Sequence, residues 1–240
     1  MTTLPRPTTP PTTGALPVAG LAKALTILTS AGGVLALPLY VSSWSDFSRV
    51  SSHVRRGMDD DAFWQQEYSK FDFLFTALYI AIPALLASTV VLLVWAYRAR
   101  TNAALISPQH HFRHSPAFSA GGLVIPYANI WFFRPIMEDI WTGSRPAGAP
   151  DDRARPVRTM WLWSLSGAVI SIVGNLAIPR SVITYDASGR LISGGAEAAS
   201  AALGTAMLNT VLCTVAVVAA VMLVKIVRQV SRWQTEQLSA

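Results

Sequence analysis

The feature that most constrains this chain is a run of 25 residues, Phe73 to Tyr97, without a charged side chain. A helix that crosses a bilayer needs about 20 consecutive apolar residues. Trp95 and Tyr97 end the run, and Arg98 and Arg100 follow it. Aromatic and arginine side chains gather in this way where a helix leaves the membrane on the cytoplasmic side. The run therefore predicts a transmembrane helix.

Three further apolar runs have a similar length. Together the four runs predict spans at about residues 24–44, 73–97, 159–179 and 199–224. Only 13% of the residues are charged, whereas an average soluble protein has about one quarter. We expect an all-α fold: a polytopic membrane helix bundle of four transmembrane helices plus a re-entrant or interfacial helical segment.

The parts outside the spans differ in composition. Residues 1–20 contain six threonines and five prolines, which predicts a disordered cytoplasmic tail. The membrane domain is expected over residues 21–232, and residues 233–240 are expected to form a C-terminal tail.

The stretch SPAFSAGGLVIPYANIWFFRPIMEDIW is apolar but interrupted. Its uncharged part, residues 117–133, has 17 residues and contains Gly121, Gly122 and Pro126. An unbroken helix between these breaks is too short to cross a bilayer. We therefore expect residues of about 115–142 to re-enter or lie on the membrane, with Pro135 in the first turn of a helix. A fifth span remains the alternative.

Charge gives the expected orientation. With four spans and both termini in the cytoplasm, 13 of the 19 lysines and arginines lie inside. With five spans the inside number is 12, so charge hardly separates the two topologies. The expected location is the cell (cytoplasmic) membrane, crossed several times, with both termini cytoplasmic.

Other classes of function find little support. The net charge of +6 is explained by arginines at span ends, so no nucleic-acid partner is expected. His110, His111 and His114 resemble a metal motif, but no acid is close by in the sequence. The neighbours Glu138 and Asp139 point about 100° apart on a helix and do not converge as an acid and base. We expect no catalytic set, metal site or cofactor.

Polar and small side chains in or beside the spans are the structural or functional candidates. One hypothesis pairs Arg98 or Arg100 with Glu138, as a latch between the 73–97 span and the interrupted stretch. Asn209 is expected to form a hydrogen bond between helices. Ser164, Gly167, Ser171 and Gly174 are expected to form a packing face. The candidate residues are Arg98, Arg100, Asn102, Pro126, Asn129, Trp131, Pro135, Glu138, Trp141 and Asn209.

Several motifs occur in a recognisable order: Trp95, YRARTNA at 97–103, Ser115-Pro116, IPYANIW at 125–131, Pro135 and MEDIW at 137–141. In this order they resemble a bacterial, largely actinobacterial, membrane family catalogued as domain of unknown function 4328. The resemblance implies a small multi-span membrane protein and implies no activity.

Two functions fit these observations. The first is an accessory, interaction or sensor subunit, whose partners are the lipid bilayer and a membrane protein or a second copy of the chain. The alternative is an oligomeric channel or transporter for a small solute, because broken helices and intramembrane asparagines line cavities in transport proteins. An enzyme that modifies lipids at the interface is a third, weaker possibility.

Overall fold

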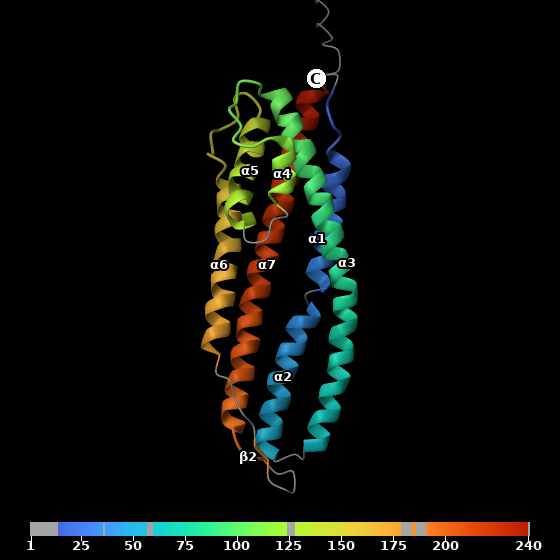
Figure 1. The fold of residues 1–240 in the computed structure, drawn as a ribbon, viewed down its shortest axis with the longest axis vertical. Helices are drawn as coiled ribbons and strands as arrows, with labels where there is room; N and C mark the ends of the chain where they lie inside the picture. The colour runs from blue at the N-terminus through green and yellow to red at the C-terminus, as the bar shows by residue number, and fades with distance from the viewer. Residues whose placement is uncertain are drawn as a thin grey trace, which may run out of the picture. The chain divides into compact units, whose positions relative to one another are not determined.

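The computed structural model describes residues 14–35, 37–56, 60–123, 128–178, 184–185 and 191–239. These residues form seven helices and one two-stranded antiparallel hairpin (Figure 1). The helices are α1 (Ala19–Leu35), α2 (Leu37–Arg56), α3 (Asp60–Ile106), α4 (Pro116–Gly121), α5 (Ala128–Ser144), α6 (Arg155–Ala177) and α7 (Gly195–Leu238). The hairpin pairs β1 (Thr184–Tyr185) with β2 (Leu191–Ser193). The predicted helical fold is confirmed.

Three helical segments of the described chain are long and apolar enough to cross a membrane. They are Ile82–Ile106 of α3, the whole of α6 and the whole of α7. The predicted spans at 73–97, 159–179 and 199–224 overlap these three helices. The protein therefore has the helices of a membrane protein.

The predicted first span, at about 24–44, is divided between α1 and α2. α1 ends at Leu35, α2 begins at Leu37, and Ala36 between them lies outside the described residues. Pro38 stands at the second position of α2. A missing backbone N–H in the first turn of a helix removes no intrahelical hydrogen bond, so Pro38 is compatible with a helix that begins there.

Both chain ends differ from the expected tails where the structure describes them. Residues 1–13 of the expected N-terminal tail lie outside the described residues, but Val18 is buried and α1 begins at Ala19. At the other end α7 continues to Leu238, and Gln234 is fully buried. The segment 233–240 was expected to be a C-terminal tail. It is helical through Leu238 because it extends a helix whose buried face includes Val227 and Val230.

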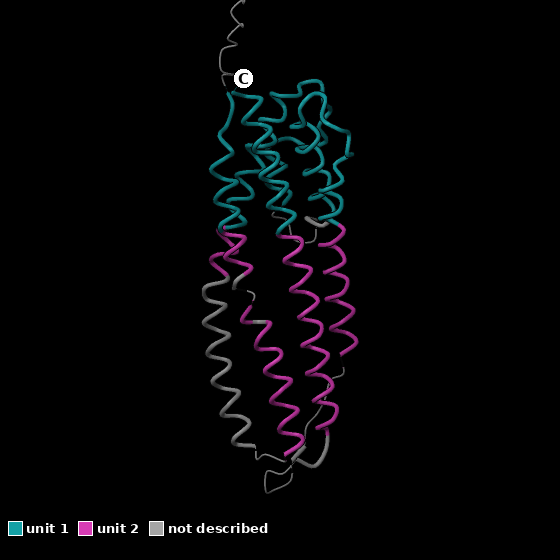
Figure 2. Tube along the Cα trace, turned by 180° about the vertical axis from the view of Figure 1, so that it is seen from behind, with its two compact units in different colours: residues 1–27, 88–161, 221–240 teal, residues 28–87, 162–220 magenta. Residues whose placement is uncertain are grey.

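The chain divides into two compact units (Figure 2). Unit 1 consists of residues 1–27, 88–161 and 221–240, and unit 2 of residues 28–87 and 162–220. The core of unit 1 is formed by α1, the end of α3, α5, the start of α6 and the end of α7. Its fully buried apolar side chains include Trp95, Ile136, Met137, Ile140, Val157, Val227 and Val230.

Unit 2 contains a close contact between α6 and α7. A Cβ added at Gly167 would lie 2.8 Å from Val215 Cγ1, and one added at Gly174 would lie 2.5 Å from Leu208 Cδ1. Small residues let helix backbones approach in this way, and van der Waals packing then holds the helices together in lipid. These two glycines of the predicted small-residue face therefore pack against α7.

Candidate functional site

The interrupted stretch forms two helices of unit 1. α4 begins after Ser115, whose side-chain oxygen accepts a hydrogen bond from the Phe118 N–H at 3.2 Å, as an N-cap does. α5 begins at Ala128, so Pro135 lies inside the helix and not in its first turn. The predicted position of Pro135 is therefore wrong. Ile136, Met137 and Ile140 beyond it are fully buried, and this packing offsets the hydrogen bond that Pro135 cannot donate.

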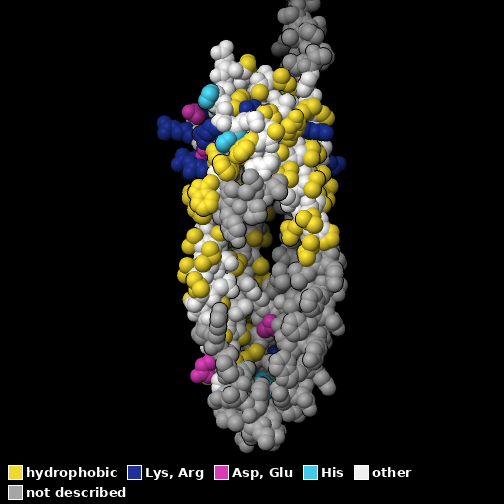
Figure 3. Space-filling view, viewed as in Figure 1, with side chains coloured by type: hydrophobic (Ala, Val, Ile, Leu, Met, Phe, Trp, Pro, Cys, Tyr) yellow, Lys and Arg dark blue, Asp and Glu magenta, His cyan; other side chains and the backbone are white. Residues whose placement is uncertain are grey.

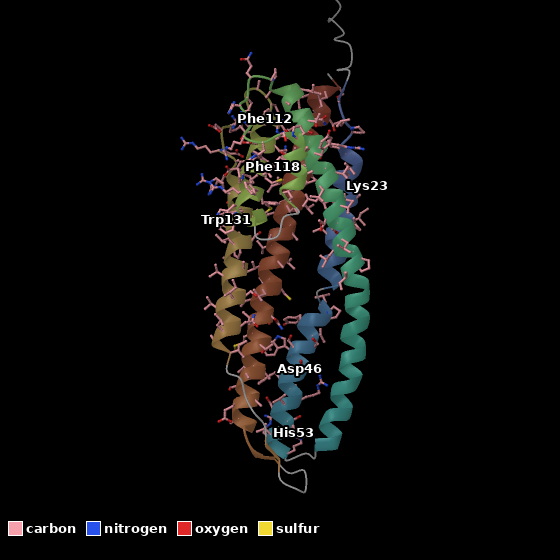
Figure 4. All side chains as sticks on the ribbon, in the orientation of Figure 1. Lys23, Asp46, His53, Phe112, Phe118 and Trp131 are labelled. Atoms are coloured by element: carbon pink, nitrogen blue, oxygen red, sulfur yellow. The ribbon has the colours of Figure 1, made fainter. Side chains whose placement is uncertain are left out.

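Two of the candidates in this stretch cannot be placed as side chains. Pro126 lies outside the described residues, and for Asn129 the description gives the helical backbone alone. Trp131 of α5 is 70% exposed and is labelled with Phe112 and Phe118 in Figure 4. Its exposure leaves a large aromatic surface on α5 for contact with lipid or with a partner.

The acidic pair of α5 bonds to arginines of its own region. Glu138 accepts a hydrogen bond from Arg134 Nε at 2.8 Å, and Arg113 NH1 lies 3.6 Å from its other oxygen. Asp139 is buried and accepts a hydrogen bond from the Arg113 backbone N–H at 2.8 Å. The hypothesis that Glu138 pairs with Arg98 or Arg100 is therefore wrong, because its partners are Arg134 and Arg113. Arg113, in the α3–α4 loop, contacts both acids.

Arg100 does connect α3 to that loop, by other contacts. Its Nε donates a hydrogen bond to the His114 carbonyl at 3.0 Å, and its guanidinium carbon lies 3.5 Å from the centre of the Phe112 ring. The side chain is 7% exposed, so this cation–π contact is shielded from water. Asp139 is close enough to interact with its charge. Arg98, in contrast, is exposed and donates a hydrogen bond to the Pro17 carbonyl at 3.0 Å.

Asn102 is the centre of a buried hydrogen-bond network. Its Oδ1 accepts from the Leu16 N–H at 2.8 Å, and its Nδ2 donates to the Leu16 carbonyl at 2.7 Å. The same Nδ2 donates to Gln234 Oε1 at 3.2 Å. Gln234 Nε2 in turn donates to the Ala99 carbonyl and to Ser144 Oγ, each at 2.7 Å. The network therefore ties the N-terminal segment, α3, α5 and α7 to one another.

Trp141 joins α5 to the loop that follows it. The indole Nε1 donates to Asp152 Oδ1 at 3.1 Å, and the ring packs edge-on against Trp233 at 4.7 Å between centroids. Asp152 also accepts from the Ala154 N–H at 3.0 Å. Next to it, the pKa of Asp151 is lowered from its ordinary value, chiefly by the side-chain hydrogen bond from Arg145. These bonds hold the exposed, charged loop against the buried end of α5.

Asn209 is a candidate in unit 2. Its Nδ2 donates to Ser43 Oγ on α2 at 2.7 Å, which is the hydrogen bond between helices that the sequence predicts. On the next residue of α7, Thr210 Oγ accepts from Trp44 Nε1 at 3.0 Å. Asn175 on α6 bonds within its own helix, to the Ser171 carbonyl. Both asparagines therefore have partners inside the protein.

The sequence analysis missed Gln234 and Ser144, and it considered Asp139 only as an acid or base; all three are buried. A signal for Gln234 existed, because it follows Val227 and Val230 at helical spacing and so extends their buried face. Within the described ranges, no group of three His, Cys, Asp or Glu side chains lies close enough together to bind a metal ion. His114 instead stacks on Phe118, with 4.7 Å between ring centroids.

These contacts form a packed polar core in unit 1. Comparison with known proteins gives the family of the chain. No curated protein and no solved structure matches the chain. One family model, described as domain of unknown function (DUF4328), matches residues 66–232. The match extends from α3 into α7 and includes all ten candidate residues, from Arg98 to Asn209. The chain belongs to the DUF4328 family.

Proposed function

We propose that the protein crosses the membrane four times, with residues of about 24–44 as the first span. Leu16, Asn102 and Gln234 are joined by hydrogen bonds inside unit 1, so they lie on one side of the membrane. An even number of crossings must then separate Leu16 from Asn102. The apolar part of α3 provides one crossing, and the apolar run in residues 24–44 is the segment available for the second.

The same reasoning supports the proposal that residues 115–142 do not cross the membrane. Arg113 lies before the segment and contacts Asp139 near its end. Because these two residues are in contact within unit 1, the chain between them enters and returns, or lies along the interface. A fifth span would separate them by the thickness of the bilayer, about 30 Å.

The basic side chains support a cytoplasmic position for unit 1. Most lysines and arginines visible on the face in Figure 3 lie over elements of unit 1. The described basic residues of unit 1 include Arg98, Arg113, Arg134, Arg145, Arg153, Arg155, Arg158, Lys225, Arg228 and Arg232. Under the positive-inside rule this distribution favours a cytoplasmic unit 1, and with it cytoplasmic termini.

Within this topology we propose a non-enzymatic accessory, interaction or sensor subunit. The observation that carries the proposal is that Asn209 and Asn175 bond inside the protein. A polar path for a solute needs side chains that can bind the solute, and these two are already bonded. Glu138 and Asp139 are likewise bonded to arginines. By contrast, Trp131 of α5 is 70% exposed and is a surface suited to a membrane-embedded partner.

The test is purification of the tagged chain from its native membrane in a mild detergent, followed by quantitative mass spectrometry. We expect a second membrane protein at a fixed ratio, and we expect Trp131→Ala to reduce its recovery while Trp163→Ala, a matched exposed tryptophan on α6, does so less. A chain that purifies as a homo-oligomer and carries solute flux in reconstituted vesicles would contradict the accessory role and establish the channel or transporter.

A further inference from the structure

Three exposed basic side chains lie on one face near the end of α7. Lys225, Arg228 and Arg232 are spaced by three and four residues, which places them on one side of the helix. Arg232 lies 3.4 Å from the exposed carboxylate of Glu236. In the part of the chain that the structure describes, Lys225 and Arg228 have no hydrogen-bonded or ion-paired partner. Two cations are thus available to a ligand.

These side chains line a groove of about 620 Å³ within unit 1. The other lining residues are Trp141 of α5, Pro156 of α6, and Met222, Ile226 and Gln229 of α7. The groove therefore combines a row of cations with apolar surface. None of its lining residues is acidic.

This combination selects for a ligand that is anionic at one end and apolar at the other. A phosphate fits the cations, because arginine and lysine bind its oxygens by charge-assisted hydrogen bonds. The cations also follow directly on the apolar part of α7, as expected where a span leaves the membrane. Basic pockets between helices at this boundary suit the head groups of anionic lipids.

We propose that this groove binds an anionic phospholipid. Its phosphate lies against Lys225 and Arg228, and its glycerol backbone and first acyl carbons lie against Met222, Ile226 and Trp141. The proposal requires that α7 spans the membrane, and it is independent of the accessory role. The purified chain alone is enough to test it, so its failure would leave the partner experiment unaffected.

A second groove supports the choice of the first. It has a volume of about 560 Å³ and lies between α1 and α7, where Lys23 and Thr26 face Arg228 and Arg232. Lys23 is labelled on α1 in Figure 4. Glu236 also lines this groove, and its carboxylate would repel a phosphate. Glu236 does not line the first groove, which offers Lys225 beside Arg228.

The experiment is native mass spectrometry of the full chain in detergent, titrated with phosphatidylglycerol, phosphatidylcholine or glycerol 3-phosphate. The test variant is Lys225→Gln with Arg228→Gln. The matched control is Arg155→Gln with Arg158→Gln, which removes the same charge from exposed positions of unit 1 outside the groove. Thermal unfolding without added lipid checks that both variants fold.

We expect phosphatidylglycerol to bind more tightly than phosphatidylcholine. The test variant should weaken phosphatidylglycerol binding roughly thirtyfold, at about 1 kcal/mol per basic residue near a lipid surface, and the control by less than about threefold. Equal binding of the two lipids, or equal losses in test and control variants, would overturn the proposal. Equally strong binding of glycerol 3-phosphate would show a site for free phosphate esters and would also overturn it.

Discussion

At the scale of single residues, the amide of Asn102 both accepts and donates hydrogen bonds at a buried site. It accepts from the Leu16 N–H and donates to both the Leu16 carbonyl and Gln234, at a site only 1% exposed. Asn102→Ala would leave these buried groups without partners, and each such group costs about 1–3 kcal/mol. We expect a loss of roughly 2–4 kcal/mol in the free energy of unfolding, measured by denaturation in detergent.

Thr101→Ala is the control for Asn102→Ala, because the Thr101 hydroxyl bonds only to the Tyr97 carbonyl of its own helix. It should change stability by less than about 0.5 kcal/mol. The N-terminal segment gives a second readout: without Asn102, limited proteolysis should cut near Leu16 faster. Equal stability and equal cleavage in the two variants would show that the network contributes nothing.

The neighbours Glu138 and Asp139 should differ sharply when neutralised. Asp139 is buried, accepts from the Arg113 N–H and interacts with the charge of Arg100. Asp139→Asn would weaken this buried hydrogen bond to a charged acceptor and remove the ion pair with Arg113, at a cost of about 1.5–3 kcal/mol. Glu138→Gln affects pairs with more exposed arginines and should cost less than about 1 kcal/mol. Thermal unfolding of the two variants in one detergent makes the comparison, and equal losses would contradict it.

For single side chains, the sequence predicts that a hydrogen bond or ion pair forms better than it predicts which residue is the partner. The hydrogen bond of Asn209 could be anticipated because an amide inside an apolar helix must find a partner in the membrane. The partner of Glu138 could not be anticipated, because several arginines lie within reach of it in the chain. Which arginine it meets depends on the path of the α3–α4 loop. That path is set by contacts such as Phe112 against Arg100, and no local pattern encodes them.

At the scale of helices, the contact between α6 and α7 depends on the absence of a side chain at Gly167. A methyl group there would lie 2.8 Å from Val215 Cγ1, and valine is stiff about χ1. Gly167→Ala should therefore destabilise the protein by about 1–3 kcal/mol, as overpacking does. Adding Val215→Ala should recover part of the loss, because it removes the atom that clashes. Unfolding of the single and double variants measures the coupling.

Gly32→Ala provides the comparison for Gly167→Ala. It is also a glycine of unit 2, but a Cβ added there meets no atom within 4 Å. Its substitution should therefore leave stability within about 0.5 kcal/mol of the parent. If Val215→Ala fails to rescue Gly167→Ala, the helices do not meet at this pair.

The ends of the helices were harder to predict than their existence. The apolar runs locate α6 and α7, because length and lack of charge are enough to indicate a span. They do not show that α7 continues to Leu238 or that α5 begins at Ala128. In both places the expectation differs from the structure: residues 233–240 were expected to form a tail, and Pro135 was expected in the first turn of a helix. Burial of Gln234 and of Ile136, Met137 and Ile140 accounts for these differences.

At the scale of the whole molecule, an even number of crossings should separate the termini, because both contribute to unit 1. Single cysteines in a Cys213→Ser background can test this topology by labelling with a membrane-impermeant maleimide. Cysteines at exposed Ala15 and Ser239 should be protected in intact cells and labelled after permeabilisation. Glu197→Cys, near the start of α7, should be labelled in intact cells. Opposite behaviour of Ala15→Cys and Ser239→Cys would contradict four spans.

The same assay decides how residues 115–142 meet the membrane. Gln109 and Ala147 are exposed and lie on either side of the segment. A re-entrant or interfacial segment places both on the cytoplasmic side, so Gln109→Cys and Ala147→Cys should both be protected in intact cells. A fifth span would place them on opposite sides, and one of the two would then be labelled. The positive-inside rule hardly separates the two topologies. Four spans place 13 of the 19 lysines and arginines in the cytoplasm, and five spans place 12 there. The contact between Arg113 and Asp139 makes the stronger argument, since both residues must lie on one side.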